Sequence, residues 1–274
     1  MIQNIHTGKV IIAGAGPGDP ELLTLKALRY LQQADVVITD RLVSDVILNE
    51  YTNKEALILH VGKQCRKGAS TPQFIINELL VEYALQGKSV VRLKGGDVSI
   101  FSNVLDELTA LLKYKIPYEI IPGITAASGA AAYAGIPLTA RDHSTAVRLL
   151  TYYKTDILND EYWKELAQTD DTLVFYMSSD TLGALLAKLI QHNISPDKHL
   201  AIIEQATTPM QNVHSHNIYE YAKNESGNTY VSPTLIIIGK VAALHQQFQW
   251  LPNSNSKNYY FKPIEKTAKA EARA

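Results

Sequence analysis

Short β-branched runs that alternate with longer helical patterns constrain the fold of this 274-residue chain most strongly. In the first half, the runs VIIAGA, DVVIT, ALILHV and SVVRLK occupy residues 10–15, 35–39, 56–61 and 89–94. Helical patterns lie between them, DPELLTLKALRYLQQ at 19–33 and TPQFIINELLVEYALQG at 71–87. This alternation predicts α/β units around a mostly parallel sheet.

A second series follows residue 122. It has the runs VRLLTYY, TLVFYM, HLAIIE and TLIIIG at 147–153, 172–177, 199–204 and 234–239, and a helical pattern, TLGALLAKLIQ, at 181–191. We therefore expect an N-terminal α/β domain over 1–121 and a C-terminal α/β domain over 122–246, with the boundary near Pro122–Gly123. The polar, low-complexity composition from Pro252 onward predicts a flexible tail over 247–274.

Composition narrows the class of protein. The formal net charge is −1, so a general basic footprint for nucleic acid is missing. Cys65 is the single cysteine, which excludes an internal disulfide framework and fits a reducing cytosol. The start of the sequence carries no apolar signal region, and no apolar run reaches the roughly 18 residues that span a membrane. We expect a cytoplasmic protein with neither a membrane nor a nucleic-acid partner.

The stretch IIAGAGPGDPELLT at 11–24 suggests a dinucleotide loop at first sight. Its glycines follow the pattern G-x-G-x-G, however, whereas the dinucleotide turn needs its third glycine inside the following helix. Asp19 would also place a carboxylate where a pyrophosphate would lie. Asp19 is instead available to cap a helix that carries Leu22, Leu25, Leu28 and Leu31 at helical spacing. A tight turn without a ligand is the plain alternative.

Four further stretches, TDRLVS (39–44), VRLKGGDVSIF (91–101), PGITAASGAAAYAGIPLTARD (122–142) and LVFYM (173–177), accompany GAGPGDPELLTLKAL at 14–28. Together they resemble the tetrapyrrole methylase superfamily, and within it most closely the uroporphyrinogen-III C-methyltransferases, which use S-adenosylmethionine (SAM). The resemblance runs in the family's order up to about residue 244. It implies two α/β domains with the active site in the cleft between them, and a homodimer.

The resemblance also implies a SAM site without a metal, from which S-adenosylhomocysteine (SAH) is released. The residues that match the family's SAM contacts are Pro17, Gly95, Gly96, Asp97, Ile100, Thr125, Ala126, Met177 and Ala206. Physical chemistry supports part of this set, because paired glycines let a backbone approach a ligand and an acidic side chain suits an ammonium group or ribose hydroxyls. Met177 has an equally plain alternative as a core residue.

The implied reaction moves methyl groups to C2 and C7 of uroporphyrinogen III and gives precorrin-2. Asp40 matches the family's proposed proton acceptor and Lys63 its proposed proton donor, although a helix cap and a solvated loop charge are the alternatives for these two. The substrate carries eight carboxylates, so cations should surround it. The candidates are Arg41, Arg66, Lys94, Arg141 and Arg148, with Lys67 the one most easily read as surface charge.

The sequence departs from the family on the expected substrate side. VSIFSNVLDE at 98–107 replaces the usual PFIFGRGGEE, and Val104 and Leu105 favour a helix where glycines would interrupt one. Ala140 replaces a histidine, while Ser178 and Ala206 replace glycines. Two alternatives stay open: a methyltransferase of a later precorrin, or a SAM-binding paralogue with impaired catalysis. His214 and His216 lack a third metal ligand and indicate a loop or edge position.

Overall fold

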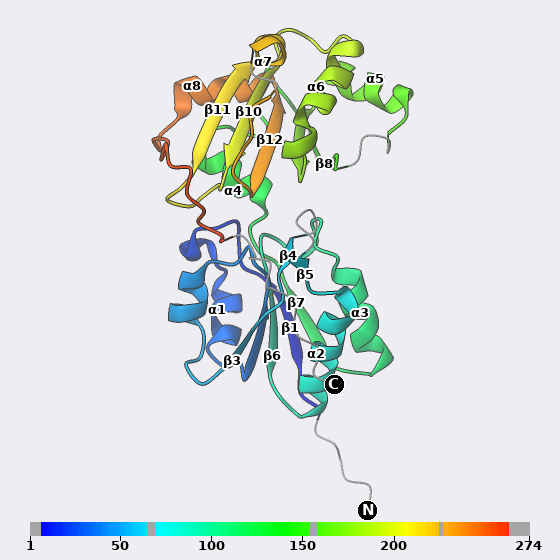
Figure 1. Cartoon of the computed structure of the whole chain (residues 1–274), viewed down its shortest axis with the longest axis vertical. Helices are drawn as coiled ribbons and strands as arrows, with labels where there is room; N and C mark the ends of the chain where they lie inside the picture. Colours follow the sequence, from blue (N-terminus) through cyan, green and yellow to red (C-terminus); the bar gives the residue numbers. More distant parts are fainter. Residues whose placement is uncertain (1–6, 65–68, 154–157, 225–226, 263–274) are drawn as a thin grey trace, which may run out of the picture. The chain divides into compact units, whose positions relative to one another are not determined.

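The computed structural model describes residues 7–64, 69–153, 158–224 and 227–262 (Figure 1). The chain divides into two compact units. Unit 1 comprises Met1–Thr125 and Phe261–Ala274, and unit 2 comprises Ala126–Tyr260. The mixed α/β class expected from the sequence is confirmed.

Unit 1 is built on a five-stranded sheet in which every strand pair is parallel, in the order β3-β2-β6-β1-β7. The strands are β1 (Val10–Gly14), β2 (Val36–Thr39), β3 (Leu57–His60), β6 (Val90–Lys94) and β7 (Tyr118–Ile121). A short antiparallel pair, β4 (Lys63–Gln64) and β5 (Ala69–Ser70), lies outside this sheet. The sequence did not predict β7, whose residues Tyr118 and Ile120 are exposed at the sheet's edge.

Helices cover both faces of this sheet, as Figure 1 shows. One face carries α2 (Gln73–Leu85) and α3 (Val104–Lys113), and its core includes Val10, Ile12 and Leu80. The opposite face carries α1 (Leu25–Leu31) and a π-helical turn, Ile47–Tyr51, and its core includes Ile11 and Leu31. Because adjacent residues of β1 enter different cores, β1 is buried on both sides and reads as one apolar run.

The first helix begins later than the sequence predicted. Asp19 caps only a 3₁₀ turn, Pro20–Leu22, by accepting a hydrogen bond from the Glu21 amide at 2.9 Å. The α-helix starts at Leu25, with the Thr24 hydroxyl accepting from the Ala27 amide. The expectation that Asp19 caps α1 is therefore wrong, because a second capping residue lies five positions further along the chain.

Unit 2 contains a mixed sheet in the order β11-β10-β12-β9-β8. The strands are β8 (Val147–Thr151), β9 (Thr172–Tyr176), β10 (His199–Glu204), β11 (Asn212–Asn217) and β12 (Thr234–Gly239). Only β8 and β9 pair in parallel, and the other pairs are antiparallel. The mostly parallel arrangement predicted from strand–helix alternation thus holds in unit 1 and not in unit 2.

The faces of the second sheet are also covered. The helices of this unit are α4 (Ala126–Tyr133), α5 (Asp160–Gln168), α6 (Leu182–Gln191), α7 (Ile218–Asn224) and α8 (His245–Phe248), with short 3₁₀ turns at Ser179–Thr181 and Lys240–Leu244. Trp163 of α5 and Leu186 of α6 share one core with Phe175 of β9. Ala130 of α4 belongs to the other core, with Val174 of β9.

The end of the described chain is not the flexible tail that its composition predicted. Residues 253–260 form hydrogen bonds to β11 and to the loop after β10. Side-chain amides supply many of these bonds, so a polar composition here reflects ordered contacts. Residues 263–274 of the predicted tail lie outside the described residues.

Candidate functional site

The motif segments of unit 1 all follow the carboxyl ends of parallel strands. The GAGPG segment begins at the last residue of β1, Asp40 follows β2, the GGD segment follows β6 and PGIT follows β7. Because these strands are parallel, their carboxyl ends meet at one edge of the sheet, where ligand sites of open α/β sheets form. Residues far apart in sequence are therefore brought to the same side of unit 1.

The glycine loops after β1 and β6 are bonded to each other. Gly16 and Gly96 exchange backbone hydrogen bonds, N to O at 3.2 Å and 2.7 Å, and both have left-handed φ values of 80° and 70°. The Ala15 amide also donates to the Lys94 carbonyl at 2.8 Å. The loop therefore turns tightly because glycine tolerates these φ values, with its amides directed at the neighbouring loop.

Gly14 brings the third loop into contact. A Cβ atom on Gly14 would lie 2.5 Å from the carbonyl oxygen of Gly96 and 2.7 Å from the Cα of Gly123. A Cβ atom on Gly123 would meet the same Gly96 oxygen at 2.3 Å. These glycines are required for backbone-to-backbone packing of three loops, which explains their spacing without a phosphate.

Asp97 joins two of these loops through its carboxylate. Oδ2 accepts a hydrogen bond from the Gly123 amide at 2.9 Å, and Oδ1 accepts from the Ser99 amide at 2.8 Å and from the Ser99 hydroxyl. Burial acts to raise the pKa of Asp97, but these hydrogen bonds outweigh it and hold the pKa below its ordinary value. Asp97 is thus an anion at neutral pH, with lone pairs left for a cationic ligand.

The segment that departs from the family pattern has a constrained backbone. Phe101 and Asn103 adopt left-handed φ values of 51° and 55°, which are uncommon for residues with a side chain. Helix α3 begins directly afterwards at Val104, as predicted, and Leu105 is exposed. Ser99, for which no role was predicted, supplies the hydroxyl that donates to Asp97.

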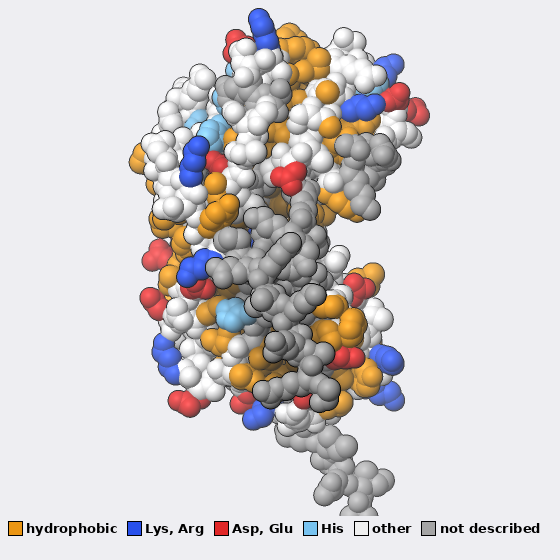
Figure 2. Space-filling model, in the orientation of Figure 1, with side chains coloured by type: hydrophobic (Ala, Val, Ile, Leu, Met, Phe, Trp, Pro, Cys, Tyr) orange, Lys and Arg blue, Asp and Glu red, His pale blue; other side chains and the backbone are white. Residues whose placement is uncertain are grey.

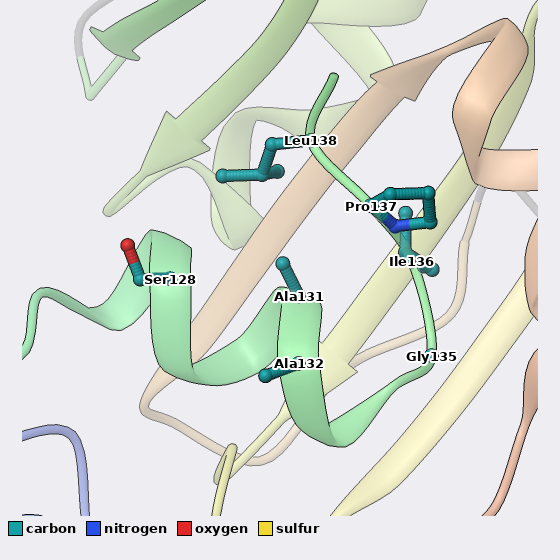
Figure 3. Close-up of a pocket in the computed structure, with 7 residues that line it drawn as sticks. All are labelled: Ser128, Ala131, Ala132, Gly135, Ile136, Pro137 and Leu138. Carbon is teal, nitrogen blue, oxygen red and sulfur yellow. The ribbon is translucent and has the colours of Figure 1, made fainter. Parts of the chain in front are cut away.

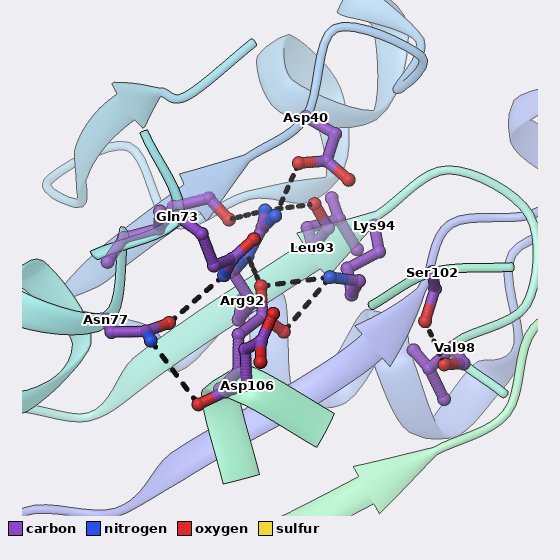
Figure 4. A network of polar contacts seen from close by, with 11 residues as sticks. Asp40, Gln73, Asn77, Arg92, Leu93, Lys94, Val98, Ser102 and Asp106 are labelled. Carbon is purple, nitrogen blue, oxygen red and sulfur yellow. Dashed lines mark hydrogen bonds and ion pairs between the residues drawn. The ribbon is translucent and has the colours of Figure 1, made fainter. Parts of the chain in front are cut away.

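Asp40 is held by a buried arginine (Figure 4). Arg92 Nη2 donates to Asp40 Oδ1 at 2.5 Å, while Arg92 Nη1 donates to the carbonyl oxygens of Ile38 and Leu93 at 3.2 Å. Arg92 is almost fully buried, whereas Asp40 keeps part of its side chain exposed. Among the described residues, no donor contacts Asp40 Oδ2, so one oxygen is fixed and the other is available.

Glu107 of α3 completes this network. Its Oε1 accepts from Arg92 Nε at 2.9 Å, and both of its oxygens accept from Lys94 Nζ at 2.9 Å and 3.0 Å. Glu107 is fully buried and Lys94 nearly so. The four side chains Asp40, Arg92, Glu107 and Lys94, which we call the buried quartet, carry two positive and two negative charges. Each buried charge therefore has an opposite partner.

The quartet explains the pKa directions of its cations. Burial acts to lower the pKa of Arg92, yet the charges of Asp40 and Glu107 outweigh it and the pKa lies above its ordinary value. Burial together with the neighbouring Arg92 charge lowers the pKa of Lys94, against the opposing effect of Glu107. Lys94 is thus bound within the chain, which argues against its predicted role as a cation for substrate carboxylates.

Arg41 has the opposite character. Its Nη1 donates to the carbonyl of Phe261 at 3.2 Å, but its buried Nε has no hydrogen-bond partner among the described residues. Burial lowers the pKa of Arg41 from its ordinary value. An arginine that follows Asp40 directly and retains an unmatched donor is suited to an anionic group.

The other predicted cations fall into three situations. Arg148 donates to Asp171 and Glu165, both at 2.5 Å, so its charge is matched in unit 2 and its predicted substrate role is disfavoured. Arg141 is exposed and forms no ion pair with a described residue. Lys63 lies in β4, and its side chain is outside the described part of the structure. Arg66, Lys67 and Cys65 also lie outside it.

Two predicted residues of unit 2 lie at strand ends with constrained backbones. Met177 follows β9 with a φ of 54° and is half exposed, which excludes its alternative as a core residue. Ala206 follows β10 between Gln205 and Thr207, whose φ values are 47° and 65°. Ala206 is not among the described residues with positive φ, so an alanine fits where the family has glycine. Constrained backbones of this kind concentrate at ligand sites.

The start of α4 is fixed beside these strands. Tyr176 accepts a hydrogen bond at its hydroxyl from the Ala127 amide at 3.0 Å, which places the predicted residue Ala126 next to the end of β9. Ser178, which replaces a family glycine, accepts from the Tyr152 amide at 2.9 Å and donates to the Tyr176 carbonyl. Thr125 ends the first of the two segments that make up unit 1.

A shallow hollow on unit 2 lies beside α4 (Figure 3). Its lining is Ser128, Ala131, Ala132, Gly135, Ile136, Pro137 and Leu138. None of these side chains is charged or titratable, so the hollow offers no acid–base chemistry. On the surface shown in Figure 2, basic and acidic side chains are interspersed, without one basic patch for a polyanion.

The structure also bears on the histidine pair, on metal-binding groups and on membrane-spanning helices. His214 and His216 lie on the edge strand β11, and His214 Nε2 lies 2.8 Å from Glu204 Oε2. No group of three metal-binding side chains occurs among the described residues. Within the same part of the chain, no helix has the length and apolar character needed to cross a bilayer.

Sequence reasoning missed Arg92 and Glu107. Arg92 and Lys94 alternate on β6, an otherwise apolar strand, so they share one face of the sheet. Two cations on a buried face require an acidic partner, and that requirement was a usable signal. The partner itself comes from α3, and its identity follows only from the tertiary fold.

Comparison with known proteins gives consistent matches. A family model described as tetrapyrrole (corrin/porphyrin) methylases matches residues 9–222. The siroheme synthase of Saccharophagus degradans is 47% identical over 244 residues, which cover 89% of this chain and 53% of that protein. The siroheme synthase of Acinetobacter baylyi is 48% identical over 244 residues, with the same coverage. This chain thus spans about half the length of the curated relatives it matches.

Solved structures match nearly their whole length. A uroporphyrin-III C-methyltransferase from Thermus thermophilus aligns with a TM-score of 0.73 and 33% identity, over 89% of this chain and 98% of that one. A uroporphyrin-III C-methyltransferase from the same organism, solved in complex with S-adenosylhomocysteine, gives a TM-score of 0.70 and 30% identity, over 86% of this chain and 94% of that one. A cobalt precorrin-4 methyltransferase gives 0.74 and 28%, over 85% and 95%.

Proposed function

Because the chain belongs to the tetrapyrrole methylase family, we propose that it transfers methyl groups from SAM to C2 and C7 of uroporphyrinogen III. The products would be precorrin-2 and two molecules of SAH. The proposal rests on the resemblance of the motifs and on the similarity to a uroporphyrin-III C-methyltransferase over most of both chains.

One observation in the structure carries the proposal. The carboxyl edge of the parallel sheet in unit 1 combines a half-anchored carboxylate, Asp40, with loops joined by Gly16, Gly96 and Asp97. A methyl transfer to an electron-rich carbon needs positioning and proton removal, and neither a covalent intermediate nor a metal is required. This edge offers both functions in the first unit alone.

The chemistry of the proposed cofactor residues fits SAM. The set consists of Pro17, Gly95, Gly96, Asp97, Ile100, Thr125, Ala126, Met177 and Ala206, none of which is basic. SAM carries no phosphate group, so its site does not need a basic side chain. Asp97 is ionised and suits the ammonium group or the ribose hydroxyls, and the apolar members suit an adenine ring.

The proposed mechanism assigns proton removal to Asp40. When bound, SAM supplies an electrophilic methyl group. Each methylated pyrrole carbon requires the macrocycle to lose a proton, and Asp40 Oδ2 is free to accept one. Arg92 fixes the opposite oxygen, so the carboxylate keeps one orientation. Lys63, in the segment after β3, remains the proposed proton donor.

The substrate carries carboxylates, so the cations proposed to bind it must not already be paired within the chain. Arg41 follows Asp40 and its Nε has no hydrogen-bond partner in the described part of the chain, while Arg141 has no ion pair with a described residue. We propose these two as partners of substrate carboxylates, with Arg66 as a further candidate from the sequence. Lys94 and Arg148 instead neutralise acidic groups of the chain. We also propose a homodimer in the cytoplasm, as the resemblance implies.

Turnover of uroporphyrinogen III with SAM tests the proposal directly. Purified protein should form precorrin-2, followed by its absorbance and by mass, with two SAH released for each precorrin-2. Calorimetry with SAH provides a separate measurement of cofactor binding. Turnover with SAH binding supports the proposal, and SAH binding without turnover removes the proposed acceptor. Absence of SAH binding would contradict SAM chemistry as a whole.

Methylation of a later precorrin is the second candidate. Two observations favour it: the cobalt precorrin-4 methyltransferase aligns with a TM-score of 0.74, and the segment at 98–107 departs from the family on the substrate side. A panel of precorrin acceptors with SAM separates the two candidates, because methylation of a later precorrin in the absence of uroporphyrinogen turnover would select the second.

A further inference from the structure

Residues 253–260, which we call the C-terminal segment, run along the edge strand β11 of unit 2. The Asn253 side chain bonds both backbone groups of Val213: its Oδ1 accepts from the amide at 2.7 Å and its Nδ2 donates to the carbonyl at 2.9 Å. The Ser254 amide donates to the Gln211 carbonyl at 2.9 Å. This segment lies beyond residues 9–222, which the family model matches.

Gln205 connects the C-terminal segment to the loop after β10. Gln205 is fully buried, its Nε2 donates to the Asn258 carbonyl at 2.9 Å, and its Oε1 accepts from the Tyr260 amide at 2.7 Å. Both functional groups of one side-chain amide are therefore satisfied by the backbone of this segment. The backbone N–H of Gln205 donates in turn to the Pro233 carbonyl at 2.7 Å.

The loop that Gln205 begins has an unusual backbone. Gln205 and Thr207 are both left-handed, and they flank Ala206, the proposed cofactor contact. The Thr207 amide donates to Gln211 Oε1 at 2.8 Å, so a second buried side-chain amide fixes the other end of the loop. Left-handed residues with side chains persist only where surrounding contacts determine their conformation.

We propose that Gln205 is a positioning residue, which uses the C-terminal segment to hold Ala206 in the conformation that binds the cofactor. This inference rests on the proposed SAM site. The two hydrogen bonds of the Gln205 amide are the direct contacts between loop and segment that carry it. The shape of the cofactor loop therefore depends on a part of the chain that follows it by about fifty residues.

Thermodynamic linkage makes this coupling reciprocal. If the segment stabilises the binding conformation of the loop, a ligand on the loop must stabilise the segment by the same factor. SAH should therefore slow hydrogen exchange of the Tyr260 amide, which donates to Gln205. A glutamine that only fills space would not transmit this protection.

The full-length variant Gln205→Met tests the inference, since methionine keeps a similar length and removes both hydrogen bonds. We expect SAH affinity by calorimetry to fall about tenfold, as the loss of two buried hydrogen bonds implies, and SAH-dependent protection of residues 255–260 to disappear. Gln205→Glu keeps the acceptor for the Tyr260 amide, so its SAH affinity should lie between those of the wild type and Gln205→Met. Lys257→Ala is the matched control, because Lys257 is exposed and its side chain forms no hydrogen bond or ion pair with a described residue.

A second variant keeps the test open if Gln205→Met does not fold. Asn253→Ala removes an exposed side chain that attaches the segment to β11, and it should weaken SAH binding in the same direction. Unchanged SAH affinity and protection in folded Gln205→Met would overturn the inference. If the wild-type protein binds no SAH, the proposed function fails instead. Hydrogen exchange without ligand then tests the contact between Gln205 and the C-terminal segment, since the amides of residues 255–260 should still exchange faster in Gln205→Met than in the wild type.

Discussion

Arg92 donates from Nη2 to Oδ1 of Asp40 at 2.5 Å, and this contact connects a nearly inaccessible cation to a carboxylate that reaches the surface. Nε of Arg92 donates to Glu107, and Nη1 donates to two backbone carbonyls. Arg92 therefore has no freedom to follow a moving partner, and Asp40 is held in one orientation. Orientation of this kind is what a general base requires.

Replacing Asp40 by asparagine should therefore impair turnover selectively. Asparagine cannot accept the proton, so we expect kcat to fall about 10²–10⁴-fold, in the range of general-base contributions. SAH affinity measured by calorimetry should stay unchanged. Asp45→Asn alters an exposed carboxylate of the same segment and serves as the control. Equal losses of turnover and SAH binding in Asp40→Asn would contradict a proton-handling role.

Neutralising Glu107 should destabilise the fold. Glu107→Gln leaves Arg92 and Lys94 as neighbouring buried cations, and breaking a buried pair costs about 3–5 kcal/mol. Urea unfolding followed by circular dichroism measures this loss. Asp106→Asn removes an exposed carboxylate from the adjacent position and should change stability by less than about 0.5 kcal/mol. Similar midpoints for both variants would show that the quartet contributes little.

Adding a methyl group at Gly14 should separate the glycine loops. The new Cβ atom would lie 2.5 Å from the Gly96 carbonyl oxygen, so backbone must shift at a cost of about 1–3 kcal/mol. We expect lower thermal stability together with weaker SAH binding in Gly14→Ala. Gly227→Ala is the control, since no described heavy atom beyond its own chain neighbours lies within 4 Å of its added Cβ. Retention of full SAH affinity by Gly14→Ala would argue that the loops are not part of the site.

The Ser99 hydroxyl should contribute to the ionisation of Asp97. Its hydrogen bond helps to keep the pKa of Asp97 below the ordinary value despite burial, so Ser99→Ala should raise this pKa. The ionised form of Asp97 stabilises the fold above the ordinary carboxyl pKa, and that stability is lost as pH falls through the folded value. Carbon-detected NMR titration measures both proteins. Ser99→Thr keeps the hydroxyl and should titrate like the wild type.

Glu119 should titrate far below an ordinary glutamate. Hydrogen bonds from Lys26, Lys9 and Tyr30 lower the pKa of Glu119 from 4.5 to about 2. Its contribution to stability is therefore complete above pH 4.5 and is lost as pH falls towards about 2. NMR titration of its carboxyl carbon measures the value directly.

The lysine beside Glu119 supplies the control for that titration. Lys26→Ala removes the largest cause of the shift and should raise the pKa of Glu119, whereas Lys113→Ala, on α3, should leave it unchanged. A midpoint near 4.5 in the wild-type protein would mean that these contacts are absent in solution.

Most of the secondary structure could be predicted from the sequence, as could the edge of the unit 1 sheet at which the motifs meet. Apolar runs such as VIIAGA predicted buried strands, and the parallel order of unit 1 placed their following motifs at one edge. Unit 2 was harder, because antiparallel strands such as β12 also read as continuous apolar runs when both faces are covered. Periodicity does not distinguish the two pairings.

Side-chain partners could not be predicted in the same way. Asp19 and Thr24 are both competent caps, and only the folded backbone decides which of them begins an α-helix. Likewise, the sequence does not show that Lys94 is paired, because its partner Glu107 comes from α3 and meets it only in the folded unit. The conformation of the C-terminal segment depends on hydrogen bonds to Gln205, which is distant in sequence. Local composition does not encode such contacts.

The packing of Gly14 against Gly123 has a consequence for the order in which unit 1 folds. Gly14 ends the first strand of the unit and Gly123 follows the last, so their contact closes a loop that contains the other strands of this sheet. Contacts between residues so far apart in sequence form slowly, because loop-closure entropy opposes them. During synthesis, the GAGPG loop must therefore wait for β7, and a nascent chain that ends before Tyr118 carries the glycine motif without the neighbour that shapes it.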